Sequence, residues 1–66
     1  MIHSEILGQS FWLDASCRSV MSAPTFIDGT PDFDNKMYVQ DWENSEELDS
    51  DQFQELIKII YRLYHR

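Results

Sequence analysis

Four acidic side chains recur at intervals of four residues in the second half of the chain: Glu43, Glu47, Asp51 and Glu55. On a continuous α-helix this spacing would align them on one face, about 6 Å apart along the axis. Two functions fit such a stripe. It could bind a patch of arginine and lysine on another protein, or it could imitate a nucleic-acid backbone. The alternative without a function is a solvated helix face that compensates the helix dipole.

Further acids surround this stripe and make the segment strongly negative. Residues 28–55 hold ten acids and one base, and the whole chain has a net charge of −7. A charge of this sign repels nucleic acid and anionic membranes and favours basic partners. The residues predicted to bind a partner are Asp41, Trp42, Glu43, Glu46, Glu47, Asp49 and Asp51.

A basic stripe near the end of the chain offers a competing interpretation. Lys58, Arg62 and Arg66 also recur every four residues, with Tyr61 and Tyr64 between them. Basic and aromatic side chains together bind nucleic acid by phosphate contacts and stacking. Three cations are few, and the remaining acids would repel the ligand, so nucleic-acid binding is the weaker hypothesis.

No residue pattern predicts a metal, a cofactor or an active site. Asp28, Asp32 and Asp34 share a short segment but lack the spacing of a calcium-binding loop, which favours a solvated acidic turn. Other candidate metal ligands are scattered along the chain: His3, Cys17 and His65. No serine lies in a nucleophile motif, and two glycines cannot build a phosphate loop. The sequence therefore predicts a protein that is not an enzyme.

The cysteine content and the N-terminal residues point to the cytoplasm. The single cysteine, Cys17, cannot form an internal disulfide, which fits a reducing compartment and a small buried thiol. The N-terminal residues show no basic segment followed by an apolar run, and no stretch approaches the roughly 18 apolar residues of a membrane span. We therefore expect a cytoplasmic protein with no membrane contact. Independently of any residue pattern, short chains of this kind are common among phage products.

One helix must position much of this acidic and basic chemistry. Residues 50–66 place apolar side chains three or four positions apart, which is the spacing of one helix face. Ser50 is the predicted N-cap, and Ile59 and Tyr61 widen the apolar sector. The apolar positions of this face are Phe53, Leu56, Ile57, Ile60, Leu63 and Tyr64.

The preceding residues favour short strands. Alternating or β-branched and aromatic residues predict strands over 2–7, 10–14, 17–22 and 36–42, with an exposed loop over 28–35. The sequence therefore predicts a single α+β domain spanning residues 1–66. Its fold would be a small antiparallel sheet of three or four strands with one C-terminal helix packed on it.

The aromatic residues outnumber what one helix-on-sheet core needs. Trp12 and Trp42 are expected on the far face of the sheet, and Phe33 in the loop, where exposed aromatics commonly anchor a partner. We therefore predict a small, acidic interaction module that binds and inhibits or modulates a larger protein with a basic surface. The alternative is a structural subunit or homodimer that assembles through the sheet edge or the helix face.

Overall fold

Four short strands form one antiparallel sheet, and the chain passes through them in sequence order. The structure is a computed structural model that describes residues 1–16 and 18–65. The sheet order is β1-β2-β3-β4, so every strand pairs with its neighbour in the chain. The strands are β1 (Ile2–Ser4), β2 (Gln9–Leu13), β3 (Val20–Pro24) and β4 (Met37–Tyr38).

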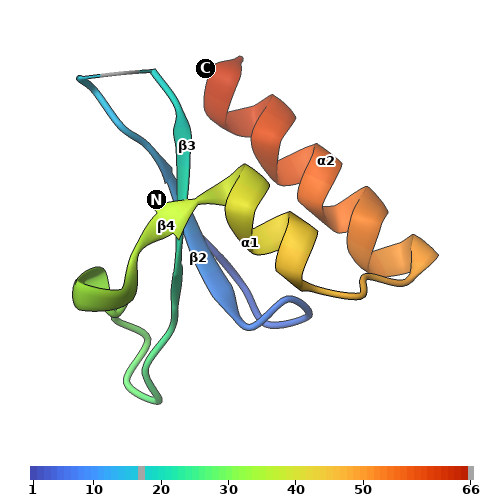
Figure 1. Ribbon diagram of the computed structural model, residues 1–66, viewed down its shortest axis with the longest axis horizontal. Coiled ribbons are helices and arrows are strands. Elements are labelled where there is room, and N and C mark those ends of the chain that lie inside the picture. The colour runs from blue at the N-terminus through green and yellow to red at the C-terminus, as the bar shows by residue number, and fades with distance from the viewer. Residues whose placement is uncertain (17, 66) are drawn as a thin grey trace.

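Two helices follow the sheet and cover one of its faces. They are α1 (Val39–Ser45) and α2 (Ser50–Tyr64). Figure 1 shows both helices on one side of the strands, with the single-turn 3-10 helix η1 (Phe33–Asn35) on the other side. The α+β fold predicted from the sequence is confirmed, including the C-terminal helix on the sheet, and α1 is an additional helix that the sequence did not predict.

The first hairpin is shorter than predicted because the chain turns immediately after Ser4. Residues 5–8 form this turn, in which the Gly8 amide donates to the Ser4 carbonyl oxygen at 2.8 Å. Gly8 has a φ of 67°, a left-handed conformation that glycine adopts without a Cβ clash. The predicted strand over 2–7 therefore ends at Ser4, and β2 begins at Gln9.

The alternation predicted for β2 is confirmed. Phe11 lies on the face that the helices cover, and Leu13 packs against the same core. Trp12 lies on the opposite face, where its ring meets Phe33 of η1 in an edge-to-face contact with centroids 5.3 Å apart. The loop that follows β3 thus covers part of the second face of the sheet.

The predicted strand over 17–22 is displaced in the structure. β3 begins at Val20, pairs Ser22 with Phe11 of β2, and ends at Pro24. Proline has no backbone N–H to donate to the ladder of strand hydrogen bonds. It is tolerated at a strand end because the ladder stops there. Cys17, predicted to be a buried thiol, lies outside the described residues.

The predicted strand over 36–42 is wrong for most of its length. Only Met37 and Tyr38 pair with β3, and α1 begins at Val39. Val39 and Trp42 are both buried in one core. A spacing of three residues places two side chains on one face of a helix but on opposite faces of a strand. Burial of this pair therefore favours the helix over the β-propensity of the local residues.

A capping box begins α2, and its N-cap is Asp49 rather than the predicted Ser50. The Asp49 carboxylate accepts from the Gln52 amide at 2.8 Å, and the Gln52 side chain accepts from the Asp49 amide at 3.1 Å. These reciprocal bonds satisfy two backbone donors at the helix start. Asp49 has an extended backbone with ψ of 177°, so the chain enters the helix only after it.

We expect the Asp49→Ala variant to lose about 1 kcal/mol of unfolding free energy, because the cap acceptor disappears. Urea denaturation followed by far-UV circular dichroism measures this loss. Ser50→Ala is the matched control. It should change the unfolding free energy by less than about 0.5 kcal/mol, as expected for a surface site without a capping bond. A larger loss for Ser50→Ala would contradict this helix start.

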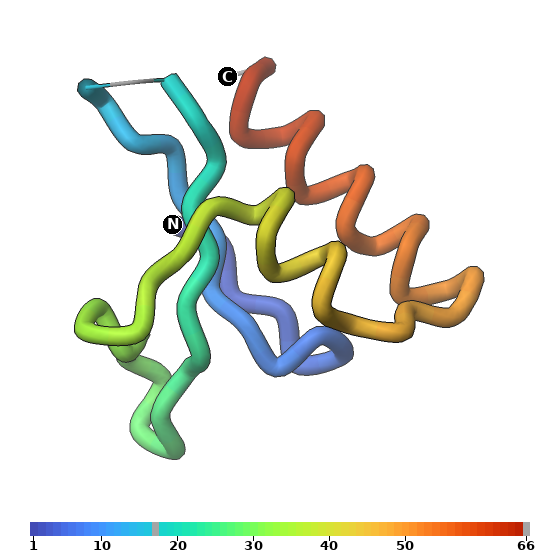
Figure 2. Tube along the Cα trace, in the orientation of Figure 1, coloured from blue at the N-terminus to red at the C-terminus, as the bar shows by residue number. Residues whose placement is uncertain are grey.

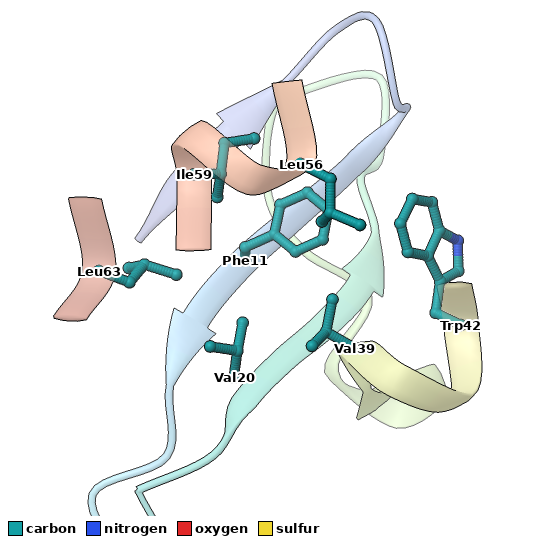
Figure 3. Packing of buried hydrophobic residues seen from close by; sticks show 7 residues of the cluster. All are labelled: Phe11, Val20, Val39, Trp42, Leu56, Ile59 and Leu63. Carbon is teal, nitrogen blue, oxygen red and sulfur yellow. The ribbon is translucent and has the colours of Figure 1, made fainter. Parts of the chain in front are cut away.

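The hydrophobic core lies between the sheet and the two helices. Figure 3 shows its side chains pointing toward one another from β2, β3, α1 and α2. Phe11 and Trp42 meet edge to face, with ring centroids 5.6 Å apart and planes at 73°. Leu48, in the connection between the helices, packs against this core from its edge. The buried members are Phe11, Val20, Val39, Trp42, Leu56, Ile59 and Leu63.

Candidate functional site

The predicted acidic stripe does not exist as one helix face. Helix α1 ends at Ser45, where the extended backbone of Glu46 (φ −108°, ψ 145°) breaks the helix. Four residues separate α1 from the start of helix α2 at Ser50, and the two helices run in different directions (Figure 1). Glu43 and Glu47 therefore cannot share a helical row with Asp51 and Glu55. The prediction of one continuous stripe is wrong because it required helix through residues 46–49.

Among the seven predicted binding residues, Trp42 is the one whose predicted position differs most from the structure. Only 5% of its surface is exposed, and its ring packs on Phe11 in the core. The sequence predicts it on the far face of a sheet, because a strand is predicted over residues 36–42. As a helical residue it faces the core and supports the surface around it. Its role in binding a partner stays a prediction.

The six acidic residues of the prediction lie around α1 and the corner between the helices. Glu43 is half-buried, and the others are exposed. Asp49 also serves as the N-cap of α2, so its carboxylate has a structural role. Within residues 1–16 and 18–65, none of the six forms an ion pair with lysine, arginine or histidine. The exposed members are Asp41, Glu46, Glu47, Asp49 and Asp51.

Three of these acids border three different depressions of the surface. Asp41 lies beside Trp12 and Tyr38, and Glu46 lies beside Pro24 and Asn35. Glu43 lines a third depression, between the two helices. The acids of residues 41–51 thus surround α1 instead of forming a row, and we call them the acidic corner.

The depression beside Glu43 is a groove of about 320 Å³ between α1 and the end of α2. Buried Val20 and Val39 and half-buried Ile60 supply its apolar floor. We call it the interhelical groove. The polar and aromatic residues that line it are Ser19, Tyr38, Gln40, Glu43 and Tyr64.

The wall formed by Tyr64 is held in place by a bond to a distant part of the chain. Its hydroxyl donates to the Arg18 carbonyl oxygen at 3.1 Å. Figure 2 shows the end of α2 close to the turn that joins β2 to β3. Sequence reasoning missed this groove because its lining comes from β3, β4 and both helices, and no local spacing marks it.

One serine and one histidine form a hydrogen bond, but the serine is fully buried and is not placed to act as a nucleophile. Ser10 Oγ lies 2.7 Å from His3 Nδ1 and 2.6 Å from Thr25 Oγ1. Ser10 is 0% exposed, so no substrate can reach its hydroxyl. These bonds satisfy a buried polar group on the far face of the sheet, which is a structural role.

The acids of the predicted loop make local turn contacts. Asp28 Oδ1 accepts from the Thr30 hydroxyl at 2.7 Å and from the Thr30 amide at 3.0 Å. These bonds lower the pKa of the Asp28 carboxyl, since they favour its ionised form. In the described part of the chain, no group of three His, Cys, Asp or Glu side chains is placed to hold a metal ion.

The competing surfaces predicted from the sequence are only partly described. Lys58 and Arg62 are exposed on α2, and Arg66 lies outside the described residues. Phe53, Ile57 and Tyr61 are also exposed on α2, so the predicted homodimer through this helix stays a prediction.

Comparisons with protein-family models, with curated proteins and with solved structures give no match for this chain. No helix within residues 1–16 and 18–65 has the length and hydropathy required to cross a membrane.

Proposed function

We propose that this protein is a non-enzymatic, cytoplasmic interaction module whose acidic corner binds a larger protein with a basic surface and inhibits or modulates it. The observation that carries the proposal is that the carboxylates of the acidic corner form no ion pairs in the described chain. Six carboxylates lie within residues 41–51, and none forms an ion pair in the described chain. Unpaired surface charges of one sign raise association rates and select partners of the opposite sign.

A protein partner is favoured over imitation of nucleic acid. A mimic needs closely spaced, regular charges, because duplex DNA carries one charge per about 1.7 Å of axis. The break at Glu46 disperses the acids around α1, which removes the one regular row that the sequence suggested. Scattered carboxylates beside an apolar groove resemble the mixed polar and apolar composition of a protein interface.

Neutralising the corner should release the partner while the fold survives. We expect the double variant Glu47→Gln with Asp51→Asn to bind about two- to thirtyfold more weakly, since each exposed ion pair contributes about 0.2–1 kcal/mol. Partners are first captured from host lysate at low salt and identified. Each captured protein is then purified, and its affinity for the wild type and the variant is measured at two salt concentrations.

The matched control neutralises two exposed acids elsewhere, through Asp28→Asn with Asp34→Asn. Both pairs change the net charge from −7 to the same value. The asparagine at position 28 retains the oxygen that accepts from Thr30. The control should bind almost as tightly as the wild type. Equal losses in both variants would show that only bulk charge matters, and no loss in either would reject the acidic corner.

A further inference from the structure

We propose that the interhelical groove binds an arginine side chain presented by the partner. This inference rests on the proposed function, because it assigns one specific contact to the basic surface that the acidic corner attracts. The groove combines the three features that an arginine side chain requires: an apolar floor, aromatic walls and a carboxylate. Val20, Val39 and Ile60 provide the floor, and Glu43 provides the carboxylate.

The carboxylate of Glu43 is free to accept a cation. It makes no hydrogen bond or ion pair with any residue in the described chain. Glu43 lies on α1 four residues after Val39 and one after Trp42, both of which are buried. This packing fixes the helix and therefore the backbone position from which the Glu43 side chain extends. A half-buried carboxylate binds a guanidinium more strongly than an exposed one, because water screens the charges less.

The tyrosines favour a flat cation over a compact one. Tyr38 and Tyr64 line the same groove as Glu43, and the bond from Tyr64 to Arg18 holds one ring in place. A guanidinium stacks on aromatic faces and is weakly hydrated, whereas the lysine ammonium is a strongly hydrated point charge. The methylene groups of an arginine stem would cover the apolar floor.

Other classes of occupant fit this groove less well. A phosphate or carboxylate ligand would meet Glu43 and the net charge of −7. A purely apolar side chain would cover the floor but leave the Glu43 carboxylate desolvated without a partner, which costs free energy. The mixture of lining residues therefore selects a side chain that is apolar along its stem and positive at its end.

The test uses the full chain and a blocked tripeptide, acetyl-Gly-Arg-Gly-amide, in a titration followed by two-dimensional NMR. We expect saturable shifts centred on Tyr38, Glu43 and Tyr64. The same peptide with citrulline in place of arginine keeps the shape and loses the charge. It should bind at least about tenfold more weakly, in line with the loss of a charge-assisted hydrogen bond. The lysine peptide should also bind more weakly than the arginine peptide.

Two matched variants assign the contact. Glu43→Gln should weaken arginine-peptide binding at least about tenfold, whereas Glu5→Gln, the same change at an exposed position outside the acidic corner, should alter it less than twofold. Dispersed amide signals in both variants confirm that the fold survives. Absence of saturable shifts, shifts spread over the whole acidic corner, or equal effects of the two variants would overturn the inference.

The failure of this inference can be told from the failure of the proposed function. If Glu47→Gln with Asp51→Asn releases the partner but Glu43→Gln leaves arginine-peptide binding unchanged, the acidic corner stands and the arginine site falls. If Glu43→Gln weakens peptide binding but neutralising the acidic corner leaves the affinity for the partner unchanged, the groove binds arginine and the proposed electrostatic function is rejected.

Discussion

Replacing Trp42 with alanine is expected to remove most of the stability of this protein. Trp42 is one of the largest side chains in the core, and it packs edge to face on Phe11. Truncating a buried tryptophan costs about 3–5 kcal/mol. A domain of this length has a total unfolding free energy of roughly 3–10 kcal/mol, estimated per residue. Urea denaturation followed by far-UV circular dichroism should therefore show a midpoint far below that of the wild type or no cooperative transition.

Trp12→Ala is the matched control for this prediction. Trp12 is half-buried on the opposite face of the sheet, where Phe33 covers part of its ring. Its loss removes less buried area, so the variant should keep a cooperative transition and lose clearly less free energy than Trp42→Ala. If Trp42→Ala had the same urea midpoint of unfolding as the wild type and lost only partner binding, Trp42 would be the exposed anchor that the sequence suggested.

The contrast between α1 and α2 shows which elements sequence patterns can predict. Helix α2 repeats its apolar spacing over several turns, so one register satisfies many residues at once. Helix α1 has seven residues and buries only Val39 and Trp42. Aromatic and β-branched residues in this short segment also fit a strand, and local propensity could not decide between them. The helix forms because it buries both Val39 and Trp42 in the same core, which a strand would not do.

The sequence predicts which segment holds the acidic residues of the candidate site, but it does not predict how they are arranged in space. Charge counting alone located the acids between Asp41 and Asp51, and the structure leaves them unpaired in the described chain. Their arrangement depends on the helix break at Glu46, which neither glycine nor proline marks, and Asn44 and Ser45 before it are only weak turn signals. The interhelical groove depends on the same break, since it forms where α1 lies against the end of α2.

The two isoleucines of α2 should respond very differently to the same substitution. Ile59 is 1% exposed in the core, whereas Ile57 is 50% exposed on the outer side of the helix. We expect Ile59→Ala to cost about 2–5 kcal/mol, the usual range for a buried isoleucine. Ile57→Ala should cost less than about 1 kcal/mol, because little area is lost and alanine has the higher helix propensity. Urea denaturation of both variants at one protein concentration measures the difference.

This pair also separates the two assembly hypotheses. The sequence spacing placed Ile57 in the central apolar row of the helix, but the structure leaves it exposed next to Phe53 and Tyr61. If Ile57→Ala is nearly neutral and light scattering finds a monomer, the outer side of α2 is solvated. If Ile57→Ala costs as much as Ile59→Ala and the midpoint rises with protein concentration, a second copy covers that side. In that case the outer side of α2 would form the homodimer contact. A partner bound at the acidic corner and interhelical groove would then lie next to the dimer interface.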